Sequence, residues 1–327
     1  MAQSTENTNL NTIFDPSTCV RKGLCPVTHL RGQDEDPLES HSLYFEQHGN
    51  GPEKLVFIMG LNSSSFSWEP QVAHFGRLSG YSVLIFDNRG VGNSTTPKGP
   101  YTTAGMAEDV ITLLDYIGWT KQKDIHIVGV SLGGMISQEL ATRIPDRILS
   151  LTLVVTKGGG RPWSNLPPWK GLSTLTRLLT IKDPQDKVPF VLPMLFPESW
   201  LDEKSPDDTQ GRTNREVQRE DWLRRATAVR PQTGMGAMSQ MAAGLTHHVT
   251  PARLNTISKG ITKVTIVTGD DDHLVNPANS DYLKKNMPEA EFVKWENTGH
   301  GITTQRPVQF NQLVERVVRE SRAKTSN

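Results

Sequence analysis

The chain has 327 residues, and its 35 Lys and Arg balance 35 Asp and Glu, which gives a formal net charge of zero. This balance gives no basic excess that would favour nucleic acid, and we expect no nucleic-acid partner. The first residues lack the apolar core of a signal peptide, and no run reaches the roughly 18–20 apolar residues of a membrane span. We therefore expect a cytoplasmic protein without a membrane span; the sequence assigns no oligomeric state.

Residues 1–38 are polar, contain several Pro and Gly, and carry Cys19 and Cys25, the two cysteines of the chain. We interpret this stretch as an N-terminal arm laid on the domain that follows. Two thiols alone do not make a zinc site, and no neighbouring His pair completes one. The sequence therefore predicts an incidental reduced pair, with no metal site.

From residue 39 onward, short β-branched runs alternate with helical patterns. Predicted strands are 43–47, 55–59, 83–86, 125–130, 149–155, 264–268 and 291–295, and predicted helices include 106–117, 132–143, 279–287 and 308–322. Several of the strands are continuous apolar runs, which is typical of strands buried on both faces of a parallel sheet. The pattern predicts an α/β fold with a mostly parallel, doubly wound sheet.

The alternation stops between residues 158 and 250, a stretch rich in Trp, Pro, Arg and Met. Helical spacing at 174–181 and 217–229 indicates a helical cap inserted into a core formed by 39–157 and 251–327. Such insertions close over a site and exclude water; a decorative insertion is the alternative. The cap's large apolar side chains would line an apolar pocket or pack the cap onto the core: Trp163, Trp169, Phe190, Met194, Phe196 and Trp200.

Ser131 stands in Gly-Val-Ser-Leu-Gly, directly after the strand 125–130 and directly before the helix 132–143. A sharp strand-to-helix turn needs small neighbours, which Gly129 and Gly133 supply. The turn would lift the Ser131 hydroxyl above the carboxyl end of the sheet, where ligands bind in open α/β folds. We therefore predict that Ser131 is a nucleophile rather than a small turn residue.

A serine nucleophile needs a base, and His300 follows the strand 291–295 with a glycine on each side. His247 and His248 compete for this role, but they belong to the predicted cap, where a substrate-contacting or structural role fits better. The acid would come from Asp270, Asp271 and Asp272, which follow the strand 264–268. The order Ser, Asp, His along the chain matches one hydrolase architecture and differs from the chymotrypsin and subtilisin orders.

Two further turns follow predicted strands. The backbone N–H groups of Leu61 and Leu132 are candidates for an oxyanion hole, because both would point to the Ser131 hydroxyl. Asp87 and Arg89 lie in a glycine-rich turn after the strand 83–86, and we interpret them as a structural brace.

Together these motifs resemble the α/β-hydrolase fold family. The resemblance rests on 129–133 as the nucleophile elbow, 87–94 as the turn D-x-R-G-x-G-x-S, 269–272 as the acid loop, and 299–301 as the histidine loop. In that acid loop the catalytic residue is the third after glycine, which favours Asp272, with Asp271 next. Many members carry His-Gly before the oxyanion loop, whereas this chain has Met-Gly, so the substrate class does not transfer.

The resemblance implies a serine hydrolase that cleaves a carboxylic ester or related acyl bond of a small, apolar substrate without metal or organic cofactor. Carbon–carbon hydrolysis, acyl transfer or perhydrolysis would use the same residues. A non-catalytic ligand receptor on this fold is the remaining alternative. The intact set Ser131, Asp272 and His300 favours an enzyme.

Overall fold

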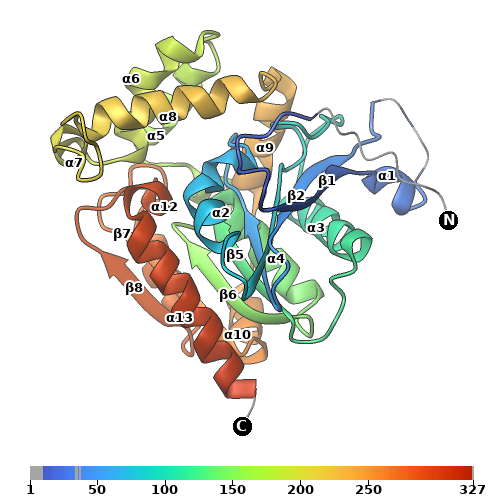
Figure 1. Cartoon of the computed structure of the whole chain (residues 1–327). Helices are drawn as coiled ribbons and strands as arrows, with labels where there is room; N and C mark the ends of the chain where they lie inside the picture. Colours follow the sequence, from blue (N-terminus) through green and yellow to red (C-terminus); the bar gives the residue numbers. More distant parts are fainter. Residues whose placement is uncertain (1–9, 34–35, 37, 326–327) are drawn as a thin grey trace.

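The structure is a computed structural model that describes residues 10–33, 36 and 38–325. Its centre is an eight-stranded sheet in the order β1-β2-β4-β3-β5-β6-β7-β8 (Figure 1). The strands are β1 (Cys19–Cys25), β2 (Leu43–His48), β3 (Glu53–Ile58), β4 (Tyr81–Phe86), β5 (Ile125–Val130), β6 (Ile148–Val154), β7 (Lys263–Gly269) and β8 (Glu291–Trp295). Strands β3 to β8 pair in parallel, while β1 and β2 pair antiparallel with their neighbours. The predicted mostly parallel sheet is confirmed.

Helices cover both faces of the sheet (Figure 1). One face packs on α3 (Thr103–Ile117), α4 (Leu132–Arg143), α10 (Pro251–Gly260) and α11 (Ala278–Asn286). The other packs on α2 (Glu69–Phe75), α12 (Ile302–Gln305) and α13 (Pro307–Thr325), with η1 (Ser65–Trp68) beside them. Along β3, Val56 and Ile58 enter the first core, and Leu55 and Phe57 enter the second. A strand with both faces buried reads as one apolar run, which explains the sequence pattern.

The N-terminal segment differs from the expected arm, because residues 19–25 form an edge strand of the sheet, followed by α1 (Val27–Leu30). Cys25 lies opposite Leu43 and Cys19 opposite His48 in the antiparallel register. The polar sequence of this strand hides its role, since an edge strand is stabilised by its partner and not by an apolar run of its own. Upstream of it, Phe14 packs into the second core.

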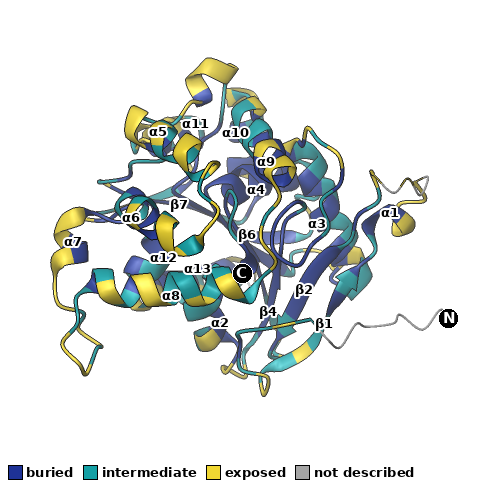
Figure 2. Cartoon of the chain, turned by 90° about the horizontal axis from the view of Figure 1, so that it is seen from above, coloured by how far each residue is buried: buried dark blue, intermediate teal, exposed yellow. Residues whose placement is uncertain are grey.

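Between β6 and α10 the chain forms helices only, apart from two isolated bridges. They are η2 (Pro162–Asn165), α5 (Trp169–Leu178), α6 (Pro184–Leu195), α7 (Glu198–Asp202), α8 (Asn214–Ala228) and α9 (Gly234–Thr246). These helices lie above one end of the sheet (Figures 1 and 2). In the described part of the chain, no helix has the length and apolar character needed to cross a bilayer.

The cap has a small core of its own, to which Val188, Leu192, Phe196 and Trp200 contribute. Phe196 and Trp200 therefore pack within the cap, and the Phe196 ring also lies against Gly301, where a Cβ would be 2.4 Å from its Cε1. Trp163 and Trp169 point largely to solvent, with 67% and 81% of their surface exposed. Their exposure excludes both side chains from the lining of a buried pocket.

Candidate functional site

Ser131 connects β5 directly to α4 in a strained backbone conformation, with φ at 56° and ψ at −119°. A non-glycine residue at positive φ is costly and persists only where its surroundings hold it. Here the Ser131 N–H donates to the Val154 carbonyl at 2.9 Å, and the Thr156 hydroxyl donates to the Ser131 carbonyl at 2.7 Å. Bonds from the neighbouring strand and the residues after it therefore fix both sides of the turn.

Two glycines let other backbone segments approach this turn. A Cβ at Gly133 would lie 2.1 Å from the Ile58 carbonyl oxygen, so α4 begins against the end of β3. A Cβ at Gly60 would lie 3.0 Å from the Ser131 Cβ and 3.6 Å from its Oγ. The turn that carries Gly60 and Leu61 therefore runs beside the Ser131 hydroxyl, as an oxyanion loop requires.

His300 and Asp272 form a buried pair, with His300 Nδ1 2.7 Å from Asp272 Oδ2. Asp272 Oδ1 accepts the backbone N–H groups of Leu274 at 2.7 Å and Val275 at 2.9 Å. Because a carboxylate only accepts hydrogen bonds, this contact assigns the proton of a neutral His300 ring to Nδ1. Nε2 is then the basic nitrogen.

The other two acidic residues of the loop have different contacts. Asp270 Oδ1 accepts the Thr298 N–H at 3.2 Å. The Asp271 side chain is 44% exposed, and its Oδ1 lies 3.4 Å from His273 Nε2. The structure therefore brings Asp272, and neither of its neighbours, to His300.

Ser131, Asp272 and His300 follow β5, β7 and β8, respectively, and the carboxyl ends of parallel strands share one edge of the sheet. Their exposed fractions are 9%, 5% and 7%, so the three residues are covered. Part of the cover comes from α6, since the Gly301 N–H donates to the Leu195 carbonyl at 2.8 Å. A hollow of about 300 Å³ lies elsewhere, between residues 98–100 and α9.

The expectation that Asp87 is a brace is confirmed by its contacts. Its Oδ1 accepts the Ser65 N–H at 2.6 Å and its Oδ2 accepts the Asn93 N–H at 2.7 Å. Burial raises the pKa of Asp87 to about 6, against the opposing effect of these bonds. Arg89 turns away to pair with Asp109, with Nε at 2.6 Å from Oδ2.

Gln240 of α9 is a contact that sequence reasoning missed. Its Oε1 accepts the Asn62 N–H at 2.8 Å, and its Nε2 donates to the Arg89 carbonyl at 2.8 Å. Asn62 follows Leu61 and has a positive φ of 54°. Gln240 is fully buried and joins the cap to the loop beside Ser131. In the sequence, the available signal was one amide side chain in a stretch rich in Met, Ala and Gly, residues 234–246.

His247 has a structural position at the end of the cap. Its Nδ1 lies 2.9 Å from the Thr103 hydroxyl, and its carbonyl accepts the Gly160 N–H at 3.1 Å. Burial lowers the pKa of His247 to about 3, which keeps the ring neutral near neutral pH. His248 is exposed.

A sequence profile of the family described as "alpha/beta hydrolase fold" matches residues 54–307, which is most of the chain. The chain belongs to this family. The match spans the strand ends that carry Ser131, Asp272 and His300, and it agrees with the sheet and its flanking helices.

This α/β-hydrolase is similar in sequence to a relative that is named as a hydrolase, and it shares its fold with solved structures of an esterase and an enol-lactonase. "Putative carbamate hydrolase RutD" of Caulobacter vibrioides is 30% identical over 276 residues, covering 83% of this chain and 93% of that protein. An esterase from Thermogutta terrifontis shares the fold with a TM-score of 0.69, 20% identity, and 92% and 99% coverage. An enol-lactonase from Burkholderia xenovorans has a TM-score of 0.67, 22% identity, and 85% and 96% coverage.

Proposed function

We propose that this α/β-hydrolase is a serine hydrolase that cleaves a carboxylic ester or a related acyl bond of a small, apolar substrate. The observation that carries the proposal is the strained Ser131 turn, with φ at 56°. Packing alone gives no reason to hold a serine in this conformation, and such strain gathers at functional sites. The buried pair of Asp272 and His300 at the same edge supports it.

The proposed reaction assigns one role to each of these residues. His300 Nε2 takes the proton from Ser131 Oγ as this oxygen attacks the substrate carbonyl carbon. The resulting oxyanion accepts hydrogen bonds from the N–H groups of Leu61 and Leu132. Asp272 holds the His300 ring and stabilises its positive charge.

The tetrahedral intermediate then collapses, and the bond between the carbonyl carbon and the leaving group breaks. Protonated His300 gives its proton to the leaving group, which leaves an ester on Ser131. His300 next removes a proton from water, which attacks this ester and releases the carboxylic acid. These steps use side chains and backbone groups of this chain together with water.

A carbamate is a second candidate substrate, and the name of the RutD relative favours it. Attack on a carbamate carbonyl uses the same nucleophile and base, and only the leaving group and the acyl product differ. The same residues could also transfer the acyl group to an alcohol in place of water. A panel of esters, thioesters and carbamates of rising chain length, with products identified, separates these reactions.

The proposal is tested with a fluorophosphonate probe and with turnover of this panel. Wild type should become labelled, and Ser131→Ala should lose both labelling and turnover while it unfolds at the same temperature. Ser173→Ala is the matched control, because this hydroxyl lies on the exposed side of α5 and donates to Lys170. Labelling that persists in Ser131→Ala would assign the nucleophile to another residue.

A further inference from the structure

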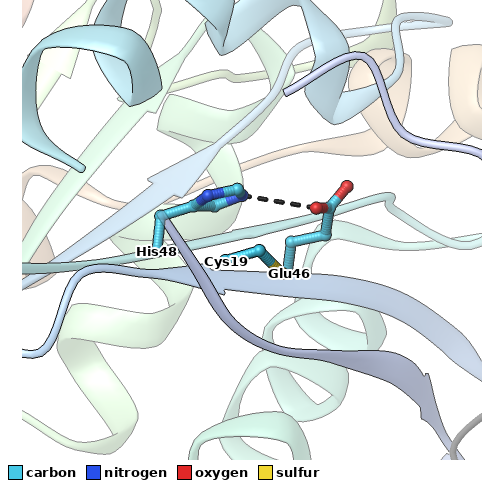
Figure 3. Close-up of side chains that lie close together, drawn as sticks. All are labelled: Cys19, Glu46 and His48. Atoms are coloured by element: carbon cyan, nitrogen blue, oxygen red, sulfur yellow. Dashed lines mark ion pairs between the residues drawn. The ribbon is translucent and has the colours of Figure 1, made fainter. Parts of the chain in front are cut away.

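Three potential metal ligands on β1 and β2 lie close together (Figure 3). In the strand order of the sheet, β1 and β2 are at the opposite end from β7 and β8. The ligand atoms of Cys19, Glu46 and His48 lie within 4.8 Å of one another, and among the described residues no other group of His, Cys and acidic side chains does so. Glu46 and His48 are both fully buried, and Cys19 is partly buried.

The contacts of His48 fix the form of its ring. The Thr18 hydroxyl donates its one proton to the Asp15 carbonyl at 2.9 Å, so its oxygen accepts from His48 Nδ1, which lies at 2.9 Å. A neutral His48 therefore carries its proton on Nδ1, and Nε2 presents a lone pair. Such a bond to the second ring nitrogen is the usual support of a metal-bound histidine.

A carboxylate oxygen of Glu46 faces the lone pair of His48 Nε2. The Tyr44 hydroxyl donates to Glu46 Oε1, which leaves Oε2 without a hydrogen-bond partner. Glu46 Oε2 lies 3.3 Å from His48 Nε2. Two acceptor atoms that face each other in a buried place repel unless a cation lies between them.

A proton on His48 Nε2 would not form a hydrogen bond to Glu46 Oε2. Both Nε2 and Oε2 lack a hydrogen-bond partner although they lie 3.3 Å apart, so the N–H direction of His48 misses the Glu46 oxygen. Two ligands held at roughly 2.0–2.1 Å from a tetrahedral zinc ion lie about 3.3 Å apart. The observed separation matches that geometry, and the Cys19 sulfur supplies a third ligand of the kind that zinc prefers.

We propose that Cys19, Glu46 and His48 form a zinc site, with solvent as the fourth ligand on the partly exposed Cys19 side. Binding releases the thiol proton of Cys19 to solvent, and the metal bonds to Cys19 Sγ, His48 Nε2 and Glu46 Oε2. Since Cys19 and His48 lie opposite one another in the register of β1 and β2, the ion would fasten the edge strand to the sheet. Its role is structural and separate from Ser131.

The test uses the full chain, freed of metal with EDTA and titrated with Co²⁺ and, separately, with Zn²⁺. We expect one Co²⁺ per chain with a thiolate-to-cobalt absorption band, and a rise in unfolding temperature with Zn²⁺. Cys19→Ser should lose the band and weaken Zn²⁺ binding at least tenfold. Thr18→Val, which removes the acceptor for His48 Nδ1–H, should weaken binding by roughly 10–100-fold and keep the band.

Cys25→Ser is the matched control, because this thiol lies in the first core and not in the group. It should keep the cobalt band and the affinity. The proposal is overturned if folded wild type binds Zn²⁺ no more tightly than folded Cys19→Ser, or if Cys25→Ser loses the band as well. Circular dichroism in EDTA establishes that each variant is folded before titration.

Discussion

Asp87 and Asp272 are both buried, both follow a core strand, and both accept two backbone N–H groups, yet their remaining contacts differ. Asp87 uses one oxygen for each N–H group, so both of its oxygens are occupied by the backbone. Asp272 accepts both N–H groups on Oδ1, which leaves Oδ2 for His300. The number of occupied oxygens, and neither burial nor position, distinguishes the brace from the residue that we propose as the acid of the triad.

The largest effect that this comparison predicts is a loss of turnover in the Asp272→Asn variant. The amide keeps an oxygen for the N–H groups of the loop, but its NH₂ group meets His300 Nδ1 and favours the wrong tautomer. We expect kcat to fall on the order of 10⁴-fold, with the fold retained. Asp271→Asn is the matched control and should stay close to wild type; the reverse ranking in steady-state kinetics would move the acid by one residue.

Asp87→Asn should lower the free energy of unfolding and leave kcat of the folded enzyme unchanged. Its NH₂ group must face either the Ser65 or the Asn93 N–H, and one donor is left unpaired in a buried site. We expect a loss of about 1–3 kcal/mol in the free energy of unfolding, measured with urea. Residual folded enzyme should keep its reaction rate per site; a collapse of kcat in fully folded Asp87→Asn would contradict the brace.

Gln240 extends the comparison to a neutral side chain, because each end of its amide contacts one backbone group. Gln240→Met removes both bonds at similar volume and loosens the loop next to Leu61. We expect kcat to fall roughly tenfold with KM nearly unchanged, since the oxyanion contact strengthens in the transition state. Gln232→Met, which removes a bond to the Asn62 side chain and one to Gly90, should have a smaller effect on kcat; equal effects would mean that general cap stability is responsible.

His247 differs from Gln240, because only one of its two polar atoms is hydrogen-bonded: Nδ1 contacts the Thr103 hydroxyl, and Nε2 has no partner. Its pKa is about 3 in the folded chain and near 6.5 in the unfolded chain, so the unfolded state binds the extra proton between these values. The contribution of His247 to the free energy of unfolding is therefore complete above pH 6.5. It falls as the pH drops below this value, by up to about 1.4 kcal/mol per pH unit. Urea unfolding of His247→Gln between about pH 7 and pH 5 should show a shallower loss than wild type; parallel curves would contradict the assignment.

The sequence predicted the core strands, the flanking helices and the order of Ser131, Asp272 and His300, because each depends on local periodicity or on a turn directly after a strand. Strand β1 was missed because its pairing with β2 is long-range and its own pattern is weak. Gln240 was missed because its partners, Asn62 and Arg89, are distant in sequence. The exposure of Trp163 and Trp169 was not predicted, because composition does not determine which face of the cap meets the core.

A hydrogen bond from the Gly301 N–H to the Leu195 carbonyl ties the histidine loop to the last turn of α6. Under the proposed function, substrate would have to pass the cap to reach the buried Ser131, and an opening that lifts α6 would pull on the residue next to His300. Substrate entry and proton transfer by His300 would then not occur at the same time, because the base would be aligned only once the cap had closed.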